Sequence, residues 1–214
     1  MALGLNLNTS NGGKDFLPIV KFDARSGRMF RRDRVNGENE EVDITKTFKA
    51  VVDFENLEIG YINFNTGSAP DFQMMPHGSS MPEKPSPDHK QGVRFTLKLH
   101  ADCGGDVREM ASNARSFLQG VDNLHNDYVV GSAKNAGKLP VVVLSGTVPV
   151  VSGEGSKRTT NYSPVFEIIG WVKRPDGLGE AAQAVEKKAT PPTTGGNKVV
   201  GPAKKMALDE DDFG

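Results

Sequence analysis

The stretch from Arg28 to Arg34 carries the strongest candidate for binding chemistry in the body of the chain, because four arginines surround one phenylalanine. In an extended strand alternate side chains share a face, which here would hold Arg28, Phe30, Arg32 and Arg34. Guanidinium groups pair with phosphates, and an aromatic ring stacks on a base for about 1–3 kcal/mol per base. The stretch therefore predicts contact with single-stranded nucleic acid. The alternative is an edge strand protected by its charges, with Phe30 in the core.

Other cations and aromatic residues at exposed positions could extend this surface. Taken singly, each is more often a solvated charge or a core ring than a ligand contact. As a group they are the remaining candidates for nucleic-acid binding: Arg31, Lys46, Lys49, Tyr61, Phe64, Arg94, Lys98, Trp171, Lys173 and Arg174.

The last nine residues, 206–214, form a second candidate site with different chemistry. Four consecutive carboxylates are followed by one aromatic ring, in the order Asp209, Glu210, Asp211, Asp212 and Phe213. The segment before them, 176–205, is rich in Pro, Gly, Thr, Ala and Lys and is expected to be a disordered linker. Such a tip can mimic nucleic-acid phosphates or bind a partner protein through its phenylalanine. The alternative is an acidic end that only improves solubility.

The charge is unevenly distributed along the chain, although the net charge is −1. Residues 1–175 carry 21 Lys and Arg against 20 Asp and Glu, whereas residues 176–214 carry 5 against 7. A near-neutral body excludes binding of nucleic acid by the whole surface. Any such binding must rest on a local basic face.

Catalytic and metal-binding patterns are weak. The sequence around Gly153–Lys157 lacks the order of a phosphate-binding loop and precedes a strand. His100 and Cys103 have no second pair of ligands, which a zinc site would need. We therefore expect no catalytic residue, no metal, no cofactor and no enzymatic activity.

Cys103 is the single cysteine, so an internal disulfide framework is excluded and a reducing compartment is favoured. The first 13 residues lack the pattern of a signal peptide. No apolar run approaches the roughly 18 residues of a membrane span. The sequence thus predicts a cytoplasmic protein without a membrane partner.

Hydrophobic periodicity predicts a mainly β body in residues 14–175, after a flexible arm in residues 1–13. Strands are expected at 16–22, 28–35, 42–54, 57–64, 93–101, 138–151 and 162–173, the third pairing with the fourth. Asn36-Gly37 predicts a tight turn, and Gly146 a bulge or bend. A helix is expected to begin at Asp106, with apolar side chains at helical spacing as far as Val121. A second short helical or irregular segment is expected at 122–130. Residues 65–92 are expected to form a long Pro-rich loop, and 152–160 a hairpin loop.

These elements favour a five-stranded Greek-key β-barrel with one inserted helix and extra hairpins, the plan of the oligonucleotide/oligosaccharide-binding (OB) fold. An immunoglobulin-like sandwich is the alternative, and the helix argues against it.

The chain resembles single-stranded DNA-binding proteins of bacteria and their phages, and in style the replication proteins of T7-type phages. The resemblance rests on the acidic tip, Asp209 to Phe213; in the body it extends only to the architecture. It implies an OB-fold core, a flexible Pro/Gly-rich linker, and an acidic tip with an aromatic residue at or near its end. Gly214 after Phe213 departs from tips that end on the aromatic residue itself.

Three functions follow as expectations. The first is sequence-independent binding of single-stranded DNA in replication or recombination, with the tip as competitor and recruiter. The second is a β-rich structural or interaction protein, for example a virion component, with a solubilising tail. The third is an accessory protein that binds RNA or duplex. The oligomeric state is left open.

Overall fold

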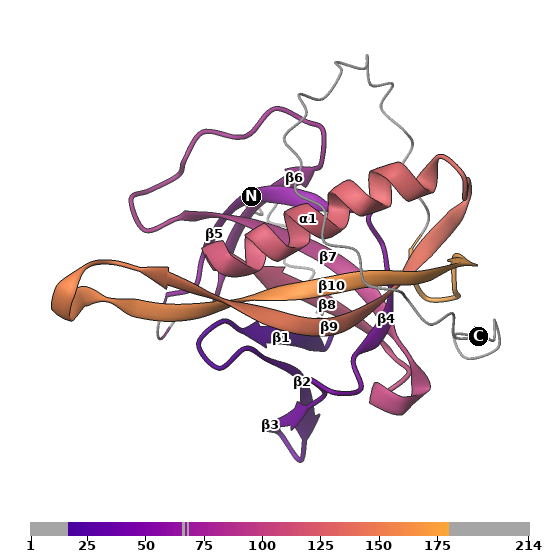
Figure 1. Ribbon diagram of the computed structural model, residues 1–214, viewed down its shortest axis with the longest axis horizontal. Coiled ribbons are helices and arrows are strands. Elements are labelled where there is room, and N and C mark those ends of the chain that lie inside the picture. Colours follow the sequence, from indigo (N-terminus) through magenta and orange to yellow (C-terminus); the bar gives the residue numbers. More distant parts are fainter. Residues whose placement is uncertain (1–16, 66, 68, 180–214) are drawn as a thin grey trace, which may run out of the picture.

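The computed structural model describes residues 17–65, 67 and 69–179. The expected N-terminal arm, most of the linker (180–205) and the acidic tip lie outside these residues. The described part is mainly β, with one α-helix and a mixed sheet (Figure 1). Its elements are β1 (Ile19–Asp23), β2 (Arg28–Val35), β3 (Glu38–Asp43), β4 (Lys49–Val52), β5 (Glu58–Asn63), β6 (Asp71–Pro76), β7 (Lys90–Leu99), β8 (Val107–Ser112), α1 (Arg115–Ser132), β9 (Lys138–Ser152) and β10 (Thr159–Lys173).

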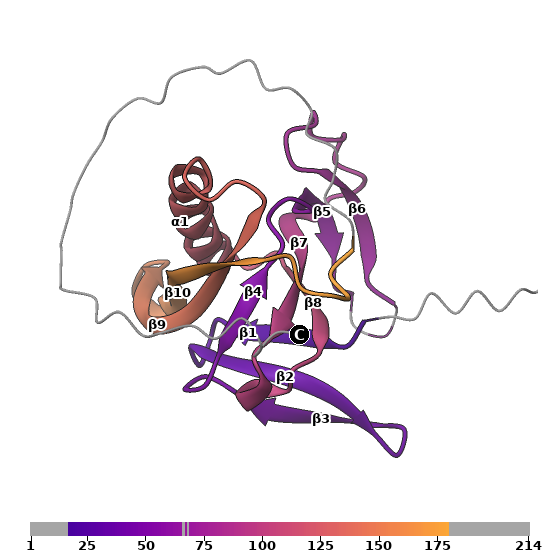
Figure 2. The same cartoon turned by 90° about the vertical axis from the view of Figure 1, so that its right-hand side faces the viewer.

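The strands form one sheet in the order β10-β9-β4-β7-β8-β1-β2-β3, and the β5–β6 hairpin joins it through β5, which pairs with β7. Neighbouring strands are antiparallel except β1 and β8, which pair in parallel at Ile19 and Glu109. Within the described residues, β10 and β3 do not pair to close the sheet. Figure 2 places β5 and β6 on one side of β7 and β8, and β9 and β10 on the other. The two groups of strands therefore flank a central pair.

Helix α1 packs on β10 because one face of the helix is apolar. Phe117, Val121 and Leu124 recur at helical spacing and are all buried. The contact is close: a Cβ on Gly120 would lie 2.5 Å from the Pro164 carbonyl oxygen. Helix and sheet together enclose the main core.

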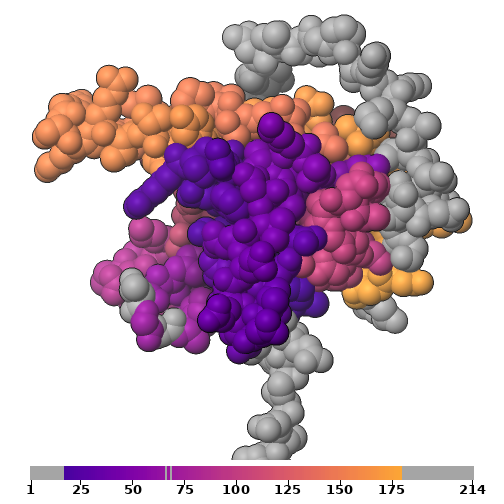
Figure 3. Space-filling view, turned by 90° about the horizontal axis from the view of Figure 1, so that it is seen from below, coloured from indigo at the N-terminus to yellow at the C-terminus, as the bar shows by residue number. Residues whose placement is uncertain are grey.

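Strands β9 and β10 are the longest, and their distal part leaves the body as a two-stranded arm, residues 147–162 (Figures 1 and 3). The arm begins at a bulge, because Val165 pairs with Gly146 and Phe166 with Leu144, which leaves Ser145 as an extra residue. The Ser145 hydroxyl donates to the Val165 carbonyl at 3.1 Å. The predicted irregularity at Gly146 is confirmed.

The predicted strand at 42–54 is wrong, because a turn at Thr45–Thr47 divides it into β3 and β4. Asp43 Oδ1 accepts from the Thr45 backbone N–H at 2.9 Å and from its hydroxyl at 2.5 Å. Such local side-chain acceptors favour turns over ladder pairing. The expected pairing of this strand with residues 57–64 is also wrong, because β5 pairs with β6 and β7.

Two further expectations need correction. Residues 107–112 form strand β8 instead of the first turns of the helix, since their apolar side chains fit either period and β7 pairs with them. The expected loop at 65–92 contains β6 and the start of β7. The bounds of β2 are confirmed, as is the turn after it, where Asn36 and Gly37 have φ values of 51° and 87°.

Candidate nucleic-acid interface

The predicted arginine strand, β2, lies beside an acidic strand. β3 carries Glu38, Glu40, Glu41 and Asp43. Arg28 Nη1 lies 3.3 Å from Asp43 Oδ2, and Arg32 Nη2 lies 2.6 Å from Glu41 Oε1. These pairs are partly exposed, so each contributes little to folding. They nevertheless cancel most of the positive charge that the sequence predicted on this face.

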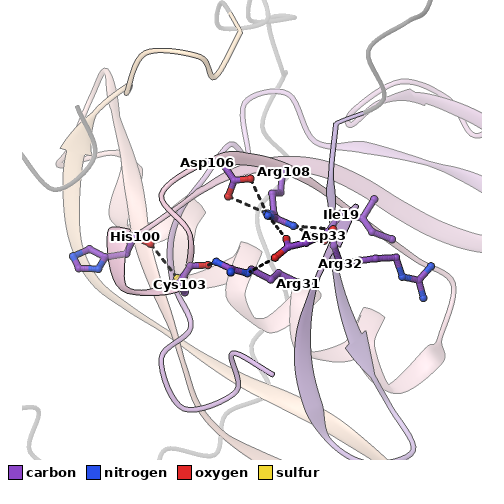
Figure 4. Close-up of polar contacts among 8 residues, drawn as sticks. All are labelled: Ile19, Arg31, Arg32, Asp33, His100, Cys103, Asp106 and Arg108. Atoms are coloured by element: carbon purple, nitrogen blue, oxygen red, sulfur yellow. Dashed lines mark hydrogen bonds and ion pairs between the residues drawn. The ribbon is translucent and has the colours of Figure 1, made fainter. Parts of the chain in front are cut away.

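Arg31 belongs to a structural network and does not extend the exposed face. Its Nε lies 3.0 Å from Asp33 Oδ2, and its Nη1 donates to the Cys103 carbonyl at 3.1 Å. Arg108, which is 5% exposed, lies 2.6 Å from Asp33 and 2.9 Å from Asp106. Figure 4 shows this network, with Arg32 pointing away from it. The network joins β2 to β8.

Trp171 and Arg174 also have structural surroundings. Trp171 stacks on Tyr128 of α1 with ring centroids 5.8 Å apart. Arg174 makes two hydrogen bonds to Asp53, at 2.7 and 2.9 Å, and one to Glu55 at 2.6 Å. Both residues therefore tie the end of β10 to the rest of the body.

A groove of about 1700 Å³ gathers another set of residues. Its floor comes from β1, β7 and β8, one wall from the β5–β6 hairpin, and another from the arm. The first turns of α1 complete it. Of the sequence-predicted residues, the groove is lined by Arg32, Phe64 and Arg94. Eleven others do not line it: Arg28, Phe30, Arg31, Arg34, Lys46, Lys49, Tyr61, Lys98, Trp171, Lys173 and Arg174.

Cations outnumber carboxylates among the side chains that line the groove. The cations are Lys21, Arg25, Arg32, Lys90, Arg94 and Arg115, and the carboxylates are Asp23, Glu58 and Glu109. Arg94 pairs with Glu58 at 2.6 Å. Among the described residues, Arg25, Lys90 and Arg115 have no ion-pair partner, and all three are exposed. The groove is thus a local basic surface on a near-neutral body.

Aromatic rings stand beside these cations at the β5–β6 wall. Phe64 is 46% exposed and meets Phe72 edge-on, with centroids 5.9 Å apart. The Arg94 guanidinium lies 5.4 Å from the centroid of Phe72, a cation–π geometry. Exposed rings next to guanidinium groups can stack bases while the cations pair with phosphates.

Glu109 opposes this charge from the floor of the groove. Burial raises the pKa of its carboxyl, the neighbouring Glu58 raises it further, and Arg94 lowers it. Glu109 therefore takes up a proton at a higher pH than an ordinary glutamate.

The groove residues that sequence reasoning missed are Lys21, Arg25, Phe72, Lys90, Arg115 and the arm valines Val150 and Val151. Lys21 had a usable signal, since it is a cation at an exposed position of the first predicted strand. Phe72 and Lys90 lie in residues 65–92, which were predicted to be a loop but contain β6 and the start of β7. The helix was predicted to begin at Asp106, so the sequence did not indicate that Arg115 is the first residue of α1.

Burial raises the pKa of the Cys103 thiol, which keeps it in its unreactive form. No group of three or more His, Cys, Asp or Glu that could hold a metal ion occurs in the described part of the chain. The one α-helix in that part is not long and apolar enough to cross a membrane.

Comparison of the chain with models of protein families, with curated proteins and with solved structures finds no match.

Proposed function

We propose that the protein binds single-stranded DNA without sequence preference, in the groove between the β5–β6 hairpin and the β9–β10 arm. The observation that carries this proposal is a set of cations without an ion-pair partner among the described residues, Arg25, Lys90 and Arg115, in one groove with the exposed ring of Phe64. Cations track a phosphate backbone, and stacking on a ring accepts every base. No cofactor takes part.

An OB-type core also belongs to the proposal. The run β10-β9-β4-β7-β8 has five strands, with α1 inserted between β8 and β9. A partly open Greek-key barrel with these parts binds oligonucleotides on its second and third strands and in two flanking loops. In this chain β7 and β8 would be those strands, with the β5–β6 hairpin and the arm as the loops. The groove lies at that position.

The acidic tip would act on the same groove. Residues 209–212 could occupy the cationic side chains when DNA is absent, because carboxylates pair with guanidinium groups as phosphates do. A bound strand would displace the tip and leave Phe213 free to recruit replication or recombination proteins. Such a role places the protein in the cytoplasm of a bacterium or of a phage-infected cell.

The direct test is a fluorescence-anisotropy titration of the full chain with labelled oligo-dT, duplex of the same length, and RNA, each at several salt concentrations. The proposal predicts preference for oligo-dT and an affinity that falls steeply with salt. Equal affinity for oligo-dT and duplex, or an affinity independent of salt, would contradict it. A preference for RNA would favour the RNA-binding accessory role.

Phe64→Ala is expected to weaken oligo-dT binding about tenfold, because one stacking contact is lost. The ring is 46% exposed, so the free energy of unfolding should change little. Phe64→Trp keeps an aromatic face and serves as the matched control. Equal losses for both variants in the same titration would show that stacking is not the role of this ring.

Glu109→Gln is expected to tighten binding about fivefold at neutral pH, because one carboxylate that repels phosphates is removed. The raised pKa of Glu109 means that, in the wild type, acidification from pH 7 neutralises this group earlier than an ordinary glutamate. Affinity of the wild type should therefore rise as pH falls, and the variant should lose this rise. No histidine lines the groove to produce the same trend. A parallel pH dependence in both proteins would assign the effect to other groups.

Deletion of residues 206–214 is expected to leave oligo-dT affinity unchanged or higher, because the competitor is gone. The gain should be greatest at low salt, where charge competition is strongest. Replacement of Asp209, Glu210, Asp211 and Asp212 by Asn and Gln keeps the length and tests charge alone. Loss of binding on deletion would refute competition between tip and DNA.

A structural or interaction protein, such as a virion component, remains the second candidate, and one observation favours it. Residues 139–153 of β9 and the loop after it carry no charge, and Val148, Val150 and Val151 are 40–52% exposed. A two-stranded arm with exposed valines, whose charged residues Glu154, Lys157 and Arg158 lie only at its tip, is typical of a surface that another protein covers. This role predicts a symmetric oligomer in solution and no affinity in the oligo-dT titration.

A further inference from the structure

A second pocket of about 440 Å³ lies where α1 crosses β5 and β7, and its lining differs from that of the groove. Apolar side chains make up much of its lining, and its polar groups come from the segment after β6, from β7 and from α1. Among its lining residues are His77, Met81, Gln91, Gln119 and His125. The size falls within the range of small-molecule sites, about 300–1,000 Å³.

Two imidazole rings give this pocket an ordered aromatic wall. His77 and His125 meet with ring centroids 4.6 Å apart, in an edge-to-face arrangement. His125 also packs edge-on against the buried Phe54, with centroids 5.5 Å apart. The backbone N–H of His77 donates to the Leu57 carbonyl at 2.7 Å, which fixes the chain that carries the first ring. A planar heterocycle could lie against rings held in this way.

The remaining side chains suit the edge of such a heterocycle. Gln91, from β7, and Gln119, from α1, each offer a donor and an acceptor, and amide side chains of this kind pair with base edges. Met81 is 39% exposed and supplies a polarizable apolar contact. The pocket thus combines ring contacts with groups that can accept and donate hydrogen bonds.

The pocket continues from the groove, because Arg115 and Gln119 line both. They are four residues apart and lie on the same side of α1. Arg115 has no ion-pair partner among the described residues, so it can pair with a phosphate at the crossing point. A DNA strand could then place one base in the groove, the next phosphate on Arg115 and the following base in the pocket.

We propose that the pocket receives one unstacked base of a single strand that leaves the groove across Arg115. This inference rests on the proposed function and adds a path and a base-binding subsite to it. The ligand class is a nucleobase joined to the rest of the strand. The rings of His77 and His125 contact the base, and Gln91 contacts its edge.

The test uses oligo-dT in which 2-aminopurine replaces one thymidine at a time, titrated with the full chain. One position, near an end of the bound stretch, is expected to change its fluorescence differently from the others. His77→Ala and Gln91→Ala should each remove that difference, and His77→Ala should weaken binding about tenfold. Gln73→Ala, on the exposed face of β6 and outside both cavities, is the control and should keep it.

Different results would contradict the proposed function and the base-binding subsite. Absence of oligo-dT binding by the wild type contradicts the proposed function itself. Normal binding with no position that responds to His77→Ala or to Gln91→Ala contradicts the subsite and leaves the groove intact. A thermal melt of each variant identifies loss of folding, and Met81→Ala, at an exposed site, then provides the alternative test.

Discussion

The double variant Lys90→Gln/Arg115→Gln is expected to bind oligo-dT about 100-fold more weakly than the wild type, with unchanged folding. Hydrogen bonds to charged groups contribute about 1.5–3 kcal/mol each, so loss of two phosphate contacts costs about 3 kcal/mol, or two decades in Kd. Both side chains are exposed and pair with no carboxylate among the described residues, so their removal breaks no ion pair there. Fluorescence anisotropy at several salt concentrations measures the effect.

The salt dependence gives this prediction a second readout. Each phosphate contact with a single strand contributes about 0.7 to the slope of log K against log salt, so the double variant should lose about 1.4. The charge-matched control is Arg34→Gln/Lys173→Gln, two exposed cations outside the groove. If the control loses affinity and the groove variant does not, DNA binds at the arginine strand instead.

Asp53→Ala is expected to lower the free energy of unfolding by about 3 kcal/mol. Asp53 is 0% exposed, and both its oxygens accept from Arg174; Asn56 Nδ2 also donates to it at 2.7 Å. Removing one partner of a buried pair leaves the other charge poorly compensated, which costs about 3–5 kcal/mol. Because Glu55 still pairs with Arg174, the low end of that range applies. For a chain of this size the melting temperature should fall by about 6–12 °C.

An exposed ion pair provides the contrast for this measurement. Arg28→Gln breaks the ion pair between Arg28, whose side chain is 62% exposed, and Asp43, whose side chain is 41% exposed. It should lower the free energy of unfolding by less than about 1 kcal/mol. Thermal melts of both variants under one buffer condition compare them. A melting temperature of Asp53→Ala close to that of Arg28→Gln would mean that the buried pair does not fix the end of β10.

The fold could be predicted in outline because periodicity identifies elements whose local pattern agrees with their packing. β2, the turn at Asn36-Gly37 and the irregularity at Gly146 belong to this group. The split between β3 and β4 was missed because alternation continues across it, while one side chain, Asp43, ends the strand. The start of α1 was missed because the pairing of β8 with β7 decides between strand and helix at 107–112, and that contact is not local.

The site was harder to predict than the fold, because charge along the chain does not show which charges neutralise one another. The arginines of β2 and the carboxylates of β3 were both visible, yet only the hairpin register, with Arg32 opposite Glu41, makes them partners. The groove draws its cations from five separate parts of the chain, one or two from each. No local pattern brings Arg25, Lys90 and Arg115 together.

The most direct test of the claim that single-stranded DNA lies in the groove is photo-crosslinking of labelled oligo-dT to the full chain, with the modified peptides identified by mass spectrometry. Binding in the groove predicts crosslinks to the β5–β6 wall, at or near Phe64 and Phe72, and to the arm. Crosslinks confined to β2 and β3, or none at a concentration where the strand is bound, would contradict it.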